Sequence, residues 1–251
     1  MASTVSPPGP PLPTEDARPN AWVERDLRRM GAAATAGLVV GGLVGGVGGR
    51  LAMMLLARLN PEVTGRISDD GFRMGQFDLG ASLGLVALTA ALGVVGGLVW
   101  LAIGPLRFGP RWFQLLTLSV GPAVVIGAGL VHQDGIDFHV LDPVELAIAL
   151  FVVLPGLAGL AMTLVGDRWV DDESWFLTGG RIRLLSLLAL VPALPALPVV
   201  FGAFVVRGLQ QSYGARRHPV PDWFLNVLRV GVTVLVALTA VDLVGDVRAL
   251  T

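Results

Sequence analysis

Six apolar stretches, each about as long as a bilayer is thick, constrain this chain more than any other feature. A helix needs about 20 apolar residues to cross roughly 30 Å of hydrocarbon. Hydrophobic residues make up 53% of the chain and charged residues 15%, a more apolar mixture than soluble domains carry. The sequence therefore predicts an all-α integral membrane protein, a bundle of six transmembrane helices. The stretches run approximately over residues 32–59, 80–103, 112–131, 144–165, 184–205 and 224–244.

Three segments follow from this pattern. Residues 1–30 are predicted to be a disordered, proline-rich cytoplasmic tail with a basic flank, because the first 20 residues hold six prolines and almost no large apolar side chain. They lack the apolar core of a cleavable secretory signal, so the first span is expected to stay as an anchor. Residues 31–245 form the six-helix domain, and residues 246–251 a short C-terminal tail.

The distribution of arginine predicts the orientation, because basic flanks are retained in the cytoplasm. With the N-terminus inside, the cytoplasmic segments hold ten arginines and the outer loops six. Residues 132–143 carry three aspartates and no arginine, which indicates an outer loop. We therefore expect a multi-pass protein of the cell membrane with both termini in the cytoplasm.

Two outer loops are predicted to add a small extended cap. In the first, Asp70 and Gly71 suit the tight turn of a β-hairpin. In the third, Ile136, Phe138 and Val140 alternate with polar residues, as in a strand with one covered face.

The first span carries glycines at an unbroken spacing of four. Residues four apart share one helix face, and small residues let helices in lipid approach closely. This glycine zipper predicts close packing, either against another span of the same chain or against a second subunit. The second span has a shorter stripe of Thr89, Gly93 and Gly97, which makes it the natural partner within the chain. The zipper consists of Gly37, Gly41, Gly45 and Gly49.

Prolines fall near the middle of three spans. Each removes one backbone donor and frees a carbonyl four residues earlier. Transporters line midplane sites with such interrupted helices, whereas many single prolines only bend a membrane helix. Both interpretations stay open for this set, which comprises Pro122, Pro155, Pro192, Pro195 and Pro198.

Charged residues within the spans form another candidate group. A charge at the centre of a membrane helix costs about 3 kcal/mol, so each is expected to have a partner. The predicted orientation puts Arg50 and Arg229 in the outer half, at the level of Asp78, Asp142 and Glu145. The resulting network is either a structural clamp or an anion or proton site.

Enzymatic chemistry and metal binding find little support in the sequence. His132, His139 and His218 fall in predicted outer loops without metal-ligand spacing, so solvated loop histidines are the default and a divalent cation is the alternative. The chain has no cysteine and no recognisable catalytic or nucleotide-binding motif. No metal or cofactor is predicted, and a net charge of −1 argues against a nucleic-acid partner.

Two segments resemble a family of uncharacterised membrane proteins of GC-rich, actinobacterial type. The first is GGRLAMMLLARLNPEVTG followed by SDDGFRMGQFDLGASLGL, and the second is DFHVLDPVELAIALFVVLPGLAGL. The resemblance covers roughly residues 35–168 and implies a similar helical membrane fold without an assigned activity.

Two hypotheses for the function follow. The first is a non-enzymatic membrane scaffold or complex subunit, whose partners are membrane lipid and either further copies of itself or another membrane protein. The second is a small-molecule or ion transporter with a site at the proline-broken helices. For a third option, a lipid-modifying enzyme, the sequence offers no residue as nucleophile or base.

Overall fold

The computed structural model describes residues 21–63, 65–67, 78–131, 137–178, 185–191 and 222–251, and this part of the chain is helical with short connections. Five of its helices are long and apolar enough to cross a membrane. They correspond to the first four predicted spans and the sixth. Of the predicted fifth span only residues 185–191 are described, as a 3₁₀ helix. Pro192, Pro195 and Pro198 lie outside the described residues.

The first span is one continuous rod of three segments. It comprises α1 (Ala21–Val40), the π-helical η2 (Gly41–Gly48) and α2 (Gly49–Leu59), followed by the short η3 (Pro61–Val63). The helix begins well before the predicted start at Ala32, because its first turns are tied down: Arg28 donates to Glu24 at 2.6 Å and to the carbonyl of Leu177 at 3.1 Å. The rod is about 55 Å long, so its first turns extend beyond an apolar layer of about 30 Å.

The remaining helices follow the predicted spans closely. They are α3 (Leu79–Ala102), the short η4 (Gly104–Leu106), α4 (Arg111–Leu130), α6 (Val144–Trp169) and α8 (Asp222–Leu250). The start of α3 is fixed by Asp78, whose Oδ1 accepts from the amide of Ala81 at 3.1 Å, the usual N-cap bond. Pro110 and Pro143 immediately precede α4 and α6.

The predicted extended cap differs from the structure where it can be compared. Residues Asp137–Val140 form α5, a single helical turn, and not a strand. Phe138 is buried, with its ring centroid 5.6 Å from that of Phe151 on α6. Its burial beside α6 satisfies the apolar side chain without a sheet. The proposed hairpin turn at Asp70 and Gly71 lies outside the described residues.

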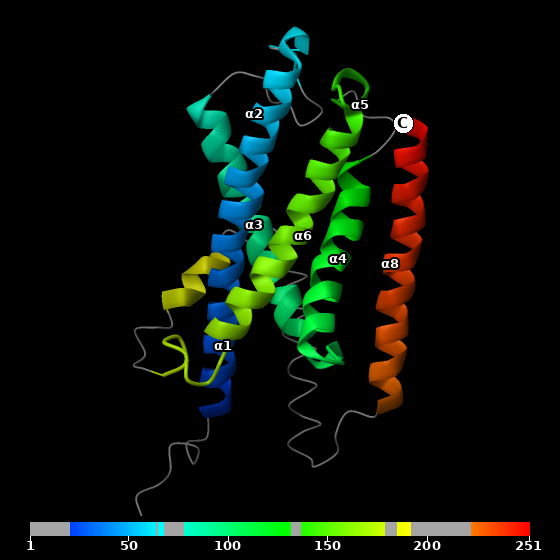
Figure 1. Ribbon diagram of the computed structural model, residues 1–251. Coiled ribbons are helices and arrows are strands. Elements are labelled where there is room, and N and C mark those ends of the chain that lie inside the picture. Colours follow the sequence, from blue (N-terminus) through cyan, green and yellow to red (C-terminus); the bar gives the residue numbers. More distant parts are fainter. Residues whose placement is uncertain (1–20, 64, 68–77, 132–136, 179–184, 192–221) are drawn as a thin grey trace, which may run out of the picture.

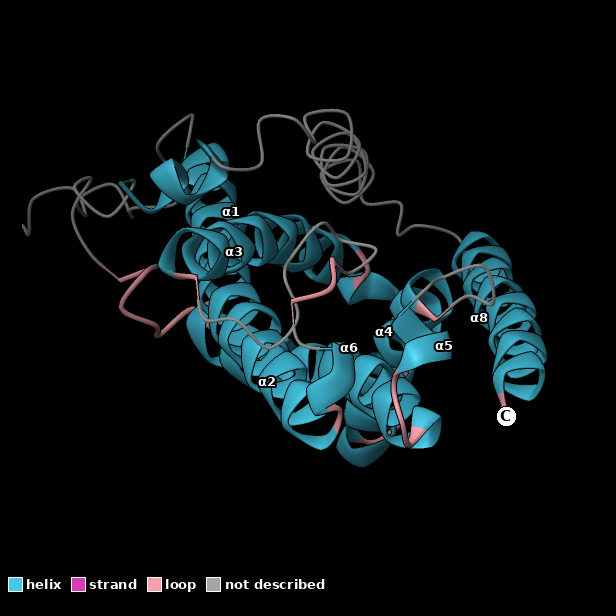
Figure 2. Ribbon diagram, turned by 90° about the horizontal axis from the view of Figure 1, so that it is seen from above, coloured by secondary structure: helices cyan, strands magenta, loops and turns pink. Residues whose placement is uncertain are grey.

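Two pairs of long helices and one peripheral helix make up the described part of the bundle. Figure 1 shows α1 and α3 side by side, α4 beside α6, and α6 crossing towards α1. The view from above in Figure 2 places α8 at the edge, next to α4. Among described residues of α8 only Leu243 is buried. This helix therefore presents most of its apolar surface to its surroundings.

The two ends of the bundle differ in composition. The starts of α1, α4 and α8 and the ends of α3 and α6 gather at one end (Figure 1). All six tryptophans of the sequence belong to this end, which we call the tryptophan end: Trp22, Trp100, Trp112, Trp169, Trp175 and Trp223. The opposite end contains the end of α2, α5 and the end of α8, and we call it the Asn60 end.

The two ends of α8 bear on the prediction that both termini lie on the same side of a membrane. The first turns of α8 are held at the tryptophan end, where Arg229 Nε donates to the carbonyl of Leu106 at 3.2 Å. Its last turns pack at the Asn60 end, where Leu243 joins the buried cluster around Leu56 and Val131. The start of α1 and the end of α8 therefore lie at opposite ends of the described bundle (Figure 1).

Candidate functional site

The glycine stripe of the first span faces α3. A Cβ at Gly37 would meet the carbonyl oxygen of Gly93, and a Cβ at Gly41 would lie 2.8 Å from the Cα of Gly93. In return, a Cβ at Gly97 would meet the carbonyl oxygen of Ala33. The two backbones thus approach so closely along this line that any side chain would separate them.

The π-helical segment changes which glycines take part. A π-helix closes its hydrogen bonds five residues apart and is wider than an α-helix, so residues spaced by four drift off a common face. Accordingly Gly46, like Gly41, faces α3, and a Cβ at Gly46 would lie 2.7 Å from the Cα of Val86. Gly45 stays beside Thr89, and Gly49 has turned away: a Cβ there would find its nearest neighbour, a methyl carbon of Leu85, at 4.0 Å. The fourth glycine of the predicted stripe is therefore only marginal to the contact.

Pro122 lies in a tight interface between α4 and α6, where its Cγ would be 2.8 Å from a Cβ at Gly159. Pro155 is buried within α6. The carbonyl that Pro122 frees is that of Leu118, and a Cβ at Gly159 would meet this oxygen. One residue further, Ser119 Oγ donates to the carbonyl of Gly156 at 3.0 Å. Neither Pro122 nor Pro155 breaks its helix, contrary to the prediction, because α4 and α6 each continue through the proline. The backbone of α6 lies against the carbonyl that Pro122 frees.

The predicted network of buried charges is only partly assembled. Arg50 Nε donates to Ser82 Oγ at 3.0 Å, and that hydroxyl donates to the carbonyl of Asp78 at 2.7 Å. The side chains of Asp142 and Glu145, at the start of α6, are exposed. Arg229 lies on α8 at the tryptophan end, so the length of α6, about 40 Å, separates it from these two acids. There Arg229 also donates to Asn226 Oδ1 at 3.0 Å.

Asn60 is a residue that the sequence reasoning missed. Its Nδ2 donates to the carbonyls of Leu56, at 2.9 Å, and Asp142, at 3.0 Å. Its Oδ1 accepts from the amide of Asp142 at 2.8 Å. The side chain is 1% exposed and joins the end of α2 to the start of α6. The Asn-Pro pair at the end of an apolar stretch was the available signal.

The predicted loop histidines, His132, His218 and the side chain of His139, lie outside the described part of the chain.

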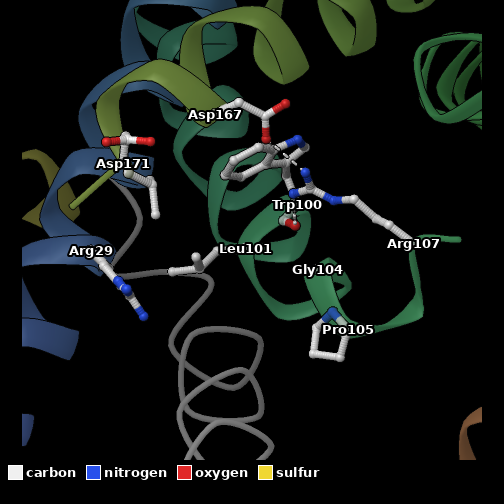
Figure 3. Close-up of a pocket in the computed structure, with 9 residues that line it drawn as sticks. Arg29, Trp100, Leu101, Gly104, Pro105, Arg107, Asp167 and Asp171 are labelled. Atoms are coloured by element: carbon white, nitrogen blue, oxygen red, sulfur yellow. Dashed lines mark hydrogen bonds and ion pairs between the residues drawn. The ribbon is translucent and has the colours of Figure 1, made fainter. Parts of the chain in front are cut away.

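A pocket of about 330 Å³ opens at the tryptophan end, between the ends of α3 and α6 (Figure 3). Arg107 reaches across the face of Trp100 from one side, and Arg29 comes from the other side, with Leu101 between them. The lining residues are Arg29, Trp100, Leu101, Gly104, Pro105, Arg107, Asp167, Val170 and Asp171.

Ion pairs join three helix ends around this pocket. Arg107 contacts Asp167 Oδ1 at 2.8 Å, and Arg111 contacts the other oxygen of the same carboxylate. Arg29 contacts Asp172 at 2.7 Å. The Arg107 guanidinium also lies 4.0 Å from the ring centroid of Trp100 and donates to the Trp100 carbonyl at 3.1 Å. One carboxylate therefore holds η4, the start of α4 and the end of α6 together.

Three N–H groups of the pocket residues have no acceptor. Arg29 Nε, Arg107 Nε and Trp100 Nε1 are buried and find no hydrogen-bond partner in the described structure. A buried donor without an acceptor costs about 1–3 kcal/mol, so such groups require an explanation. Neither these residues nor Asp167 stood out in the sequence, because their proximity depends on how α3, η4 and α6 pack.

Comparison with protein-family models, with curated proteins and with solved structures finds no match.

Proposed function

We propose that this chain is a multi-pass integral membrane protein that acts as a non-enzymatic scaffold or subunit of a membrane complex. Its five long apolar helices support insertion in a bilayer. In this proposal the glycine zipper of the first span joins two helices of one chain, so the surface for assembly lies elsewhere, on the outward face of the bundle.

The observation that carries the proposal is the packing of the proline-containing helices. A transporter needs a polar opening where its helices are interrupted. Here the Leu118 carbonyl, freed by Pro122, faces the backbone of Gly159, and the side chain of Ala123 lies against Gly156. α4 continues through Pro122 as one helix, and α6 packs against it there, which favours a closed structural role over transport.

The charge distribution supports placing the tryptophan end in the cytoplasm. Basic residues near helix ends are retained on that side, and tryptophan rings prefer the headgroup level. Of the arginines in the described residues, seven belong to the tryptophan end and four to the opposite half. The seven are Arg25, Arg28, Arg29, Arg107, Arg111, Arg168 and Arg229, and the four are Arg50, Arg58, Arg66 and Arg248.

Thiol accessibility tests the closed core, since the chain has no cysteine of its own. In sealed membranes, we expect Ala123→Cys to resist a charged methanethiosulfonate that readily modifies Thr251→Cys at an exposed position. Both variants should react fully after denaturation, which verifies that each thiol is present. Fast modification of Ala123→Cys in the membrane would support the transporter instead.

The assembly itself is tested by mass. Protein is extracted from its native membrane in a mild detergent, and light scattering measures the protein mass of the particle. This mass should exceed that of one 26.3 kDa chain. A single chain in every mild detergent would count against the scaffold.

A further inference from the structure

The hydrogen-bonding groups of the pocket at the tryptophan end are out of balance. Its acceptors are largely used: both oxygens of Asp167 bind arginines, the Trp100 carbonyl binds Arg107, and Asp171 Oδ1 accepts from the amide of Glu173 at 2.9 Å. Its surplus groups are all donors, the N–H groups of Arg29, Arg107 and Trp100. The ligand that complements this pocket is therefore rich in acceptors and poor in donors.

Two properties of the pocket favour a phosphate as the acceptor-rich ligand. Arginine is the side chain best suited to phosphate, because its planar guanidinium donates in a fixed fork. Two arginines line this pocket from opposite sides (Figure 3). Gly104 contributes no side chain to the wall, so a bulky tetrahedral group can approach the backbone there.

The position of the pocket indicates where the phosphate comes from. Trp100 lines it and Trp169 belongs to the same end of α6, and tryptophan marks the headgroup level of a bilayer. Leu101, Pro105 and Val170 add apolar walls, which suit the glycerol and first methylene groups of a lipid. Arginine-bearing pockets between membrane helices on the cytoplasmic side bind lipid headgroups; in this pocket the two arginines stand beside two aspartates, Asp167 and Asp171.

We propose that this pocket binds the phosphodiester of a membrane phospholipid, with Arg29 and Arg107 donating to its oxygens. The inference rests on the proposed membrane embedding. In the described conformation neighbouring atoms cover the three N–H groups. In this proposal binding moves the Arg107 side chain from the face of Trp100 towards the phosphate, so that its guanidinium and the indole N–H can both donate to the phosphate.

A short-chain phospholipid provides the test. The full chain, stripped of lipid in detergent, is titrated with dihexanoyl phosphatidylglycerol, with dihexanoylglycerol, which lacks the phosphate, and with inorganic phosphate. Native mass spectrometry reports the adduct and thermal unfolding the stabilisation. We expect a one-to-one adduct with the phospholipid, no adduct with dihexanoylglycerol, and weaker binding of inorganic phosphate.

Matched variants locate the site. Arg107→Gln is expected to weaken phospholipid binding by about tenfold or more, as loss of a charge-assisted bond implies. Arg111→Gln removes a charge from the same ion-pair cluster, but Arg111 does not line the pocket. The phospholipid affinity of this variant should therefore stay close to that of the unaltered chain. Trp100→Phe keeps an aromatic ring under Arg107 and removes only the N–H, and should weaken binding by a smaller factor.

Three results would overturn the inference: equal binding of dihexanoylglycerol, equal effects of Arg107→Gln and Arg111→Gln, or unaltered binding by both Arg107→Gln and Trp100→Phe. If inorganic phosphate bound as tightly as the phospholipid, the pocket would be reassigned to a free anion. If the chain instead stayed in the aqueous phase on detergent partition, the membrane proposal itself would fail, which is a separate outcome.

Discussion

At the scale of single residues, Asn60 is the side chain whose loss should matter most for stability. It makes three hydrogen bonds at a fully buried position. Asn60→Ala leaves the Leu56 carbonyl and the Asp142 backbone without this partner, so we expect a loss of about 1–3 kcal/mol. The thermal midpoint in detergent should fall by about 2–4 °C for each kcal/mol.

Asn226→Ala is the matched control for this prediction. Asn226 is exposed and makes one described side-chain bond, to Arg229, so its replacement should change stability by less than about 0.5 kcal/mol. Equal midpoints for the two variants would show that Asn60 does not join α2 to α6.

At the scale of helices, the contact between α1 and α3 makes a prediction about two neighbouring glycines. A Cβ at Gly93 would collide with the Gly37 carbonyl and lie 2.8 Å from the Cα of Gly41, whereas a Cβ at Gly96 meets nothing within 4 Å. Gly93→Ala must push two backbones apart and should destabilise the protein by about 1–3 kcal/mol. Gly96→Ala should be neutral or stabilise by up to about 1 kcal/mol, because alanine favours the helix.

Thermal unfolding of both variants in the same detergent decides this. A Gly96→Ala protein that is as unstable as Gly93→Ala would mean that glycine is needed for helix flexibility and not for the close approach of α1 and α3.

Helices were largely predictable from sequence because lipid-length apolar runs have few alternative folds. Gly37 and Gly41 were also readable, since helical spacing alone puts them on one face. The π-helical geometry of η2 was not, because a glycine-rich apolar run fits an α-helix equally well. This geometry brings Gly46 against Val86 of α3 and turns Gly49 away from α3. The same limit applies to α5, where burial of Phe138 beside α6 outweighed an alternating pattern.

At the scale of the whole molecule, the sequence was a poor guide to which residues share an end. Asp167 and Arg107 are 60 positions apart, and no pattern in either segment reveals that they meet. Arg229 was predicted beside Asp142 because a fifth crossing was assumed before it. The contact of Arg229 with Leu106 places it at the other end, together with all six tryptophans.

The position of the C-terminus relative to the tryptophan end tests this arrangement most directly. We expect Thr251→Cys, in intact cells, to react with a membrane-impermeant maleimide, and Glu173→Cys, exposed near the end of α6, to react only after the membrane is permeabilised. This result would place the tryptophan end in the cytoplasm and the end of α8 outside. Protection of both thiols in intact cells would contradict it and return the protein to six crossings with both termini in the cytoplasm.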